Sequence, residues 1–269
     1  MTWLLAALVF AWGLAIGSFI NVCVYRLPRG KSVVMPRSFC PGCGVPIKWH
    51  DNIPLLSFIL LRARCRNCRA PISWRYPAAE LLTALLFLWV HFHIFGGRQQ
   101  LFLVPFYWYF CASLVALSAI DLEHYIIPDR ITYPLAAVGL FLAGLHPVRL
   151  GQGTIGGGLF RALLGLAVGG AALFLVRILG RAAFKKEAMG MGDVKLMAAV
   201  GAWQGWAPTL LAVFLGAVVA AVVGVALVAA KKARWQSNLP FGPYLALGSL
   251  VTLLYGSELL HWYLNFFRI

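Results

Sequence analysis

The sequence predicts an all-α integral membrane protein with about eight transmembrane helices and a cytoplasmic zinc-binding insert. Hydrophobic residues make up 61% of the 269 positions, whereas charged residues make up only 12%. Soluble domains usually carry about 25% charged residues, so this composition excludes an ordinary soluble protein. A bilayer core takes about 20 apolar residues as helix, because backbone polar groups cannot stay unpaired in hydrocarbon.

Apolar stretches that suit this rule recur along the whole chain. They lie at 3–25, 78–95, 101–120, 131–146, 157–180, 194–206, 207–230 and 241–264. The stretch at 194–206 is short, and Gly and Pro at 201–208 favour a tight hairpin with the next helix. The first stretch lacks a positive n-region and a small-residue cleavage site, which indicates a retained anchor and not a signal peptide.

Positive charges are concentrated in the loops on one side of these helices. Ten of the 23 Lys and Arg residues lie between Arg26 and Arg75. The other loops on this side, at 121–130, 181–193 and 231–239, carry Arg130, Arg181, Lys185, Lys186, Lys231, Lys232 and Arg234. The opposite side has only Arg98, Arg149 and Arg268. Positively charged loops stay in the cytoplasm, so we expect both termini to lie on the outer face.

This topology divides the chain into a first transmembrane anchor at 1–25, a cytoplasmic insert at 26–77 and a multi-helix membrane domain at 78–269. The net charge of +15 is also compatible with nucleic-acid binding by the insert. A basic face beside apolar helices is more often a topology signal. We therefore expect the lipid bilayer, and no nucleic acid, as a partner.

The insert contains two C-x-x-C pairs, "CPGC" at 40–43 and "CRNC" at 65–68, separated by 21 residues. Such pairs can place four thiolates around Zn²⁺, with Cys40, Cys43, Cys65 and Cys68 as ligands. The alternative is two disulfides or unpaired thiols, and a reducing cytoplasm disfavours the disulfides. A four-Cys site leaves no open position for water, so we expect the zinc to stabilise the loop and not to perform chemistry.

Carboxylates are rare, and four of the eight, Glu123 among them, lie in two short segments beside apolar helices. Asp121 and Asp129 lie in "DLEHYIIPD", and Asp193 lies in "GMGD". Each could simply cap a helix or be solvated. A cap, however, does not require Gly190 and Gly192, which permit positive φ or close backbone approach.

A pair of carboxylates at a membrane boundary suits aspartic-protease chemistry. Two acids brought together in a semi-dry site share one proton, and the pair can activate water while polarising a peptide carbonyl. The spacing alone leaves open whether Asp121 or Asp129 is the partner of Asp193. A proton-coupled or ion-coupled transporter would also use intramembrane carboxylates and remains the alternative class.

Several segments, in order, resemble the type IV prepilin leader peptidases, which are GxGD aspartyl proteases of the bacterial inner membrane. These segments are "GSFINVCVYRLPRG" at 17–30, the tetracysteine insert, "DLEHYIIPD", "GMGDVKL" and "LPFGPYLALG" at 239–248. The resemblance implies that Asp121 and Asp193 are catalytic and that the active site and insert face the cytoplasm. The supporting residues that follow from it are Asp129, Gly190, Gly192 and Lys195.

The resemblance also implies the reaction. Family members cleave the basic leader of prepilins or pseudopilins, which serve type IV pili or type II secretion. Members with a tetracysteine insert typically also methylate the new N-terminal amine with S-adenosylmethionine. The residues themselves indicate no methyl-donor site, so a peptidase without methyltransferase activity remains an alternative.

Overall fold

The computed structural model describes residues 2–95, 101–184, 189–231 and 239–266. Within these ranges all regular secondary structure is helical apart from two isolated β-bridges, which confirms the all-α prediction. The chain divides into two compact units, Met1–Ile120 and Asp121–Ile269, each described here by itself. Some charges of the topology argument lie outside the described residues, namely Arg98, Lys185, Lys186, Lys232, Arg234 and Arg268.

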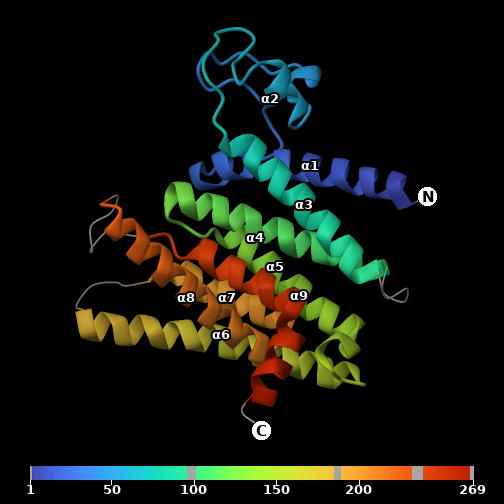
Figure 1. Ribbon diagram of the computed structural model, residues 1–269, viewed down its shortest axis with the longest axis vertical. Coiled ribbons are helices and arrows are strands. Elements are labelled where there is room, and N and C mark those ends of the chain that lie inside the picture. Colours follow the sequence, from blue (N-terminus) through green and yellow to red (C-terminus); the bar gives the residue numbers. More distant parts are fainter. Residues whose placement is uncertain (1, 96–100, 185–188, 232–238, 267–269) are drawn as a thin grey trace. The chain divides into compact units, whose positions relative to one another are not determined.

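Every predicted apolar stretch coincides with a helix (Figure 1). These helices are α1 (Thr2–Arg26), α3 (Arg75–Phe95), α4 (Val104–His124), α5 (Asp129–Leu145), α6 (Ile155–Phe184), α7 (Met191–Gln204), α8 (Trp206–Ala229) and α9 (Gly242–Phe266). The short helix α2 spans Leu56–Leu60, and 3₁₀ turns occur at Leu27–Arg29, Trp49–Asn52, Leu101–Leu103 and Pro147–Leu150.

Within the described residues, four helical segments are long and apolar enough to cross a membrane. They are Trp3–Arg29, Val104–His124, Ile155–Ala183 and Trp206–Ala229. In the last of these only 17% of the most apolar 18-residue window is buried. Apolar side chains that point outward along a whole helix suit contact with lipid. The protein is therefore a membrane protein.

Helix α7 serves a different purpose, because its 14 residues extend only about 21 Å, less than the hydrocarbon core of about 30 Å. Nine of these residues are buried: Asp193, Val194, Leu196, Met197, Ala199, Val200, Gly201, Ala202 and Trp203. It packs against α5, α6, α8 and α9 and is the core of the second unit. Gly205, with φ of 78°, turns the chain directly into α8, which confirms the expected hairpin.

Glycines let the helices of the second unit approach closely. Gly201 of α7 faces Gly165 of α6, and a methyl group on either would meet the other's backbone. Small residues at helix contacts are typical of membrane proteins, where packing replaces the hydrophobic effect between helices. On another side of α7, the indole N–H of Trp203 donates to the carbonyl of Leu135 in α5 at 2.7 Å. These contacts hold the last turn of α7, the helix whose first turn contains Asp193.

In the first unit α1 packs against α3, and residues 27–74 link the two helices. Gly17 of α1 lies so close to α3 that an added Cβ would be 2.5 Å from the Cα of Glu80. The amide of Asn21 donates to the carbonyl of Tyr76 at 3.1 Å. The end of α1 and the start of α3 are thus joined beside the insert.

Candidate active site and metal centre

Asp121 is buried in the last turn of α4, where its side chain is held by another helix. Its Oδ2 accepts the backbone N–H of Gly242, the first residue of α9, at 2.9 Å. A helix N-terminus carries partial positive charge and favours a carboxylate. We expected Asp121 just after a helix ending at 120. The helix instead continues to His124, because a helix can extend beyond its apolar segment where its residues are compatible with helix.

Asp193 is buried in the first turn of α7 and accepts a hydrogen bond from the backbone N–H of Gly190. Gly190 is the N-cap residue of α7, and Asp193 is the third residue after it. A contact from this position to the backbone N–H of the N-cap residue is one of the two hydrogen bonds of a capping box. The helix-cap interpretation is therefore correct in part. Asp193 also lies close enough to Asp121 for their charges to interact, which capping does not require.

The turn between α4 and α5 links the surroundings of the two acids. Tyr125, with φ of 55°, ends α4, and Pro128 is the N-cap of α5. Between them lies Ile127, which packs closely on Gly192. A Cβ added to Gly192 would be 2.7 Å from the Cβ of Ile127. A Cβ on Gly242 would likewise be 3.2 Å from Ile127 Cδ1 and 2.8 Å from Asp121 Oδ2.

The two glycines before Asp193 therefore differ. Gly192 requires the absence of a side chain because of Ile127. Gly190 requires neither close approach nor an unusual backbone: its φ is −75°, and its Cβ would be in ordinary contact, 3.7 Å from Asp193 Oδ2. Close backbone approach therefore explains the glycine at 192, whereas neither close approach nor a positive φ explains Gly190.

Asp129 is engaged elsewhere. Lys195 Nζ lies 2.7 Å from its Oδ1 and 2.8 Å from its Oδ2, and the same ammonium lies 5.3 Å from the ring centroid of Tyr133. This ion pair joins the first turns of α5 and α7. Asp129 is thus neutralised by a lysine, whereas the charge that acts on Asp193 is that of Asp121.

The four cysteines of the insert lie in two knuckles of the same construction. The N–H of Cys40 donates to the carbonyl of Val45 at 3.0 Å, and the N–H of Cys65 donates to that of Ala70 at 2.9 Å. Each knuckle is closed by one antiparallel bridge, at Phe39–Pro46 and at Arg64–Pro71. This repetition directs both pairs of thiols toward one point.

The sulfur geometry fits a tetrahedral metal ion. The four Sγ atoms all lie within 4.8 Å of one another, and Cys40 Sγ is 3.8 Å from Cys68 Sγ. Zn–S bonds of about 2.3 Å in a tetrahedron separate the sulfurs by about 3.8 Å. All six cysteines of the chain are free. The backbone N–H of Val45 and the side chain of Asn67 lower the pKa of Cys43 to about 7. At Cys68 the lowering by the backbone N–H of Ala70 is outweighed by burial and the neighbouring cysteines, which raise its pKa to about 11, so the metal-free thiols do not ionise equally.

Two residues near the acids could not be assigned a role from the sequence. Gly242 carried one signal, since it precedes Pro243 at the start of an apolar stretch, and proline is favoured in the first turn of a helix. Ile127 carried none, because an isoleucine in a short linker looks the same whether or not it packs on a glycine.

Comparisons with known proteins agree with this architecture. Residues 11–94 match the bacterial peptidase A24 N-terminal domain, and residues 108–225 match the type IV leader peptidase family. Proteins named prepilin leader peptidase/N-methyltransferase are similar along their length. That of Aeromonas salmonicida strain A449 is 37% identical, covering 98% of this chain and 96% of the relative. That of Pseudomonas aeruginosa is 35% identical, covering 94% and 91%.

A further relative of the same name, from Aeromonas hydrophila, is 38% identical over 99% of this chain and 96% of its own length. No solved structure matches the chain. Full-length similarity at this identity, with both family segments in the same order, leaves one assignment. The chain belongs to the type IV leader peptidase family.

Proposed function

We propose that the protein is a membrane aspartic endopeptidase that removes the basic leader of type IV prepilins or pseudopilins. We further propose that it N-methylates the new N-terminal residue. Family membership and the names of the full-length relatives support both activities. The observation that carries the peptidase proposal is the pair of buried carboxylates of Asp121 and Asp193, which interact electrostatically and are each held by a backbone N–H.

The chemistry follows from this pairing. Two adjacent buried carboxylates cannot both be ionised cheaply, so the pair holds one proton. The ionised member takes a proton from water, whose oxygen attacks the scissile carbonyl carbon, while the protonated member donates to the carbonyl oxygen. The C–N bond of the resulting tetrahedral intermediate then breaks, and a proton from the dyad passes to the leaving amine.

Neighbouring residues would keep the dyad in place. The Asp129–Lys195 ion pair fixes the turn at 125–128 against the start of α7. Gly192 allows Ile127 of that turn to reach the helix. Gly190 contributes its backbone N–H, which donates a hydrogen bond to the carboxylate of Asp193.

We place this site at the cytoplasmic boundary of the bacterial inner membrane. The charge bias of the loops supports the predicted topology of eight membrane helices, of which α7 is short and buried among the others, with the insert at 26–77 facing the cytoplasm. The membrane domain at 78–269 would then present the acids at the depth where a basic leader ends and an apolar pilin helix begins. The four cysteines would hold a structural Zn²⁺, which ties together a loop with almost no buried side chains.

The methyl donor of the second activity would be S-adenosylmethionine, which supplies an electrophilic methyl group. The chain must bind it where the new N-terminal amine can reach it and must exclude competing nucleophiles. A peptidase without this activity would cleave prepilin normally and transfer no methyl group.

The decisive experiment compares wild type, Asp121→Asn and Asp193→Asn, purified in detergent and incubated with a prepilin. Asparagine keeps a side-chain oxygen for the N–H groups of Gly242 and Gly190, so both variants should remain folded. We expect each to lower cleavage by at least about a thousandfold. The exposed Glu258, changed to Gln, is the matched control and should cleave normally. Near-normal turnover by either aspartate variant would contradict the dyad.

The same samples test the transporter alternative. Reconstituted vesicles should show no ion flux that depends on Asp121. Flux that is abolished by Asp121→Asn, together with absent cleavage by wild type, would replace the peptidase proposal.

A further inference from the structure

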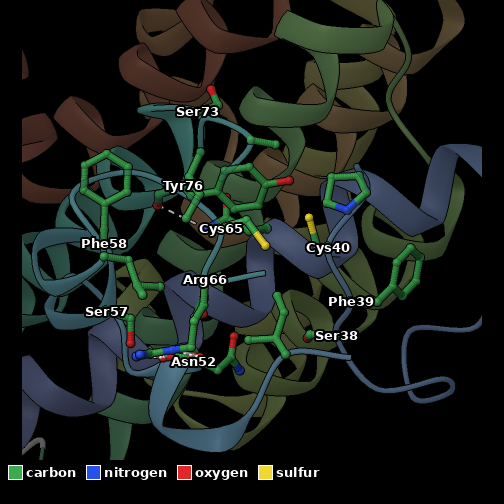
Figure 2. A pocket seen from close by; sticks show the side chains of 18 of the residues that line it. Ser38, Phe39, Cys40, Asn52, Ser57, Phe58, Cys65, Arg66, Ser73 and Tyr76 are labelled. Carbon is green, nitrogen blue, oxygen red and sulfur yellow. Dashed lines mark hydrogen bonds and ion pairs between the residues drawn. The ribbon is translucent and has the colours of Figure 1, made fainter. Parts of the chain in front are cut away.

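The insert folds back onto the end of the first helix and does not extend away from it. A cavity of about 580 Å³ lies between them, lined by the last turns of α1, by both cysteine knuckles and by the beginning of α3, including Glu80. Figure 2 shows side chains of this lining, among them Cys40, Cys65 and Tyr76. The apolar segment Trp3–Arg29, which is long enough to span a membrane, leads directly into the insert. The insert therefore lies beside the part of α1 that ends at a membrane boundary.

Helix α2 of the insert has its polar and apolar sides reversed. Its one polar residue, Ser57, is only 7% exposed. The hydroxyl of Ser57 accepts the N–H of Ile53 at 3.0 Å and donates to the carbonyl of His50 at 3.0 Å. By contrast, Ile59 is 68% exposed and Leu60 is 69% exposed. A helix on a water-facing surface has the opposite arrangement, with its apolar residues turned inward. The outer side of α2 thus suits an apolar environment.

Contacts on the inner side of α2 fix this orientation. Leu55 precedes the helix with φ of 58°, and its N–H donates to Oε2 of Glu80 at 2.9 Å. Glu80 is buried and belongs to α3. The ring of Phe58 packs edge-to-face on Trp74, with ring centroids 4.7 Å apart. Helix α2 therefore cannot turn its apolar side inward without losing a hydrogen bond to α3 and a ring contact.

The exposed apolar residues of α2 belong to a larger surface, which we call the apolar patch. The patch consists of Trp49, Leu56, Ile59, Leu60 and Trp74. The turn that begins at Trp49 contacts α2, and Trp74 adjoins α2 through Phe58. Trp49 is 81% exposed and Trp74 is 74% exposed. Exposed apolar patches mark contacts with proteins or membranes, and tryptophan is enriched where a membrane meets water.

Basic residues accompany the apolar patch. Lys48, Arg62 and Arg64 lie next to patch residues in the sequence, and all three are exposed. The insert contains ten Lys and Arg residues but a single acid, Asp51, which Arg66 holds at 2.6 Å. Apolar and aromatic side chains combined with basic ones are typical of segments that lie in the surface of an anionic membrane. The same charges disfavour the basic leader of a prepilin as the occupant, because like charges repel.

We propose that the apolar patch docks the insert onto the anionic lipid surface of the cytoplasmic leaflet. The patch side chains enter the boundary between headgroups and acyl chains, and the neighbouring Lys and Arg side chains contact lipid phosphates. The inference rests on the proposed cytoplasmic position of the insert and adds the surface on which the insert lies. Docking holds the cysteine knuckles beside the membrane boundary and keeps them from moving freely in the cytoplasm.

The test identifies what the patch contacts in the full-length, zinc-loaded protein. Ile59→p-benzoylphenylalanine introduces a photoreactive side chain into protein reconstituted in vesicles of phosphatidylethanolamine and phosphatidylglycerol. After irradiation, mass spectrometry identifies the molecule that is joined to residue 59. The control carries the same group at Arg69, toward the tip of the second knuckle, whose base at Ala63 and Ile72 adjoins α2. We expect at least about tenfold more lipid adduct from position 59 than from position 69.

Two further comparisons separate apolar contact from charge. Leu60→Glu, added to the photoreactive protein, should lower the lipid adduct at least about fivefold, because anionic headgroups repel the carboxylate. Val34→Glu makes the same change of charge at an exposed position outside the patch and should lower the adduct much less. In vesicles of neutral phosphatidylcholine the adduct of the photoreactive protein should fall at least about threefold. The zinc content of each sample reports folding.

Several outcomes would overturn the inference. If residue 59 is joined to another segment of this chain, to a second copy or to added prepilin in place of lipid, the patch has a different occupant. Equal lipid adducts from positions 59 and 69 would show that the patch does not direct docking. Equal adducts in anionic and neutral vesicles would show that the basic residues do not select the lipid.

Prepilin cleavage in the same vesicles tests the proposed function separately. Cleavage without a lipid adduct at residue 59 overturns the docking inference and leaves the peptidase proposal standing. A lipid adduct without cleavage by the wild-type protein overturns the peptidase proposal and leaves the docking inference standing.

Discussion

The insert of the first unit and helix α7 of the second reach a defined geometry by opposite means. Between residues 27 and 76 only Cys40 and Ser57 are buried, whereas nine of the 14 residues of α7 are. The insert relies on backbone hydrogen bonds and on four clustered cysteines that could bind a metal, whereas α7 relies on close helix packing. A functional group can thus be held rigidly by a core or by a ligand, and the two should fail under different conditions.

Metal removal should give the largest effect and should affect the insert alone. Structural zinc contributes about 10–16 kcal/mol in small metal-dependent folds, and the insert has almost no core to replace it. We expect a chelator, or Cys40→Ser, to make residues 27–76 sensitive to protease. The helices of the second unit should stay resistant. Cys23→Ser, outside the cluster, is the matched control. A chelated insert that stays resistant would show that the metal is not structural.

A single methyl group should disturb the other region. Gly192→Ala places a Cβ 2.7 Å from Ile127 Cβ, so the turn at 125–128 must move away from α7. Overpacking of this kind costs about 1–3 kcal/mol, and we expect prepilin cleavage to fall more than about tenfold. Gly224→Ala in α8 meets nothing within 4 Å and should leave both thermal stability and cleavage near wild type. Equal behaviour of the two variants would mean that the Ile127 contact is unimportant.

The ion pair on the insert should give a smaller, pH-dependent effect. Arg66 holds the Asp51 carboxylate with contacts of 2.6–3.1 Å and lowers its pKa. A lowered pKa means stabilisation that is complete above the unfolded value of about 3.9 and is lost as pH falls through the folded value. His50 Nε2 also lies 3.8 Å from Asp51 Oδ2, so the comparison is made in the His50→Gln variant. In that background, thermal metal release with and without Asp51→Asn should differ by the same amount at pH 7 and pH 5. The difference should shrink only below about pH 4. A difference that grows on acidification would contradict this sign.

The smallest effect concerns the backbone of the two knuckles. Gly44 has φ of 71°, and Arg69 has φ of 58° at the equivalent position of the second knuckle. A left-handed conformation costs an L-residue about 1–2 kcal/mol, which the greater flexibility of unfolded glycine partly offsets. We expect Arg69→Gly to raise the midpoint of metal release slightly and Gly44→Arg to lower it. If Arg69→Gly lowers the midpoint while Gly44→Arg also lowers it, the two knuckles are not equivalent.

The helices of this protein could be predicted because long apolar segments are the strongest signal that a sequence carries. The role of each helix in the fold could not be predicted in this way. A stretch such as 194–206 looks the same whether it faces lipid or lies inside a bundle, and only its shortness favoured the core. The cysteine cluster could be predicted because its four members lie in two local C-x-x-C pairs.

The carboxylates show the limit of prediction from local sequence patterns. The sequence marked Asp121, Asp129 and Asp193 as unusual, but the partner of Asp193 depends on how the turn at 125–128 packs. The cavity beside Glu80 was not predicted at all. It depends on an unusual backbone at Leu55 and on contacts between α1, α3 and the insert, none of which has a sequence signature.

The hydrogen bond from Gly242 to Asp121 spans 121 positions of the chain and has a consequence for biosynthesis. A ribosome makes 241 residues of this sequence before residue 242 exists, and the amide that holds Asp121 is delivered only with α9. A nascent or prematurely terminated chain thus has its acids but not their final arrangement. The proposed peptidase would therefore become active late, after the preceding helices have entered the bilayer.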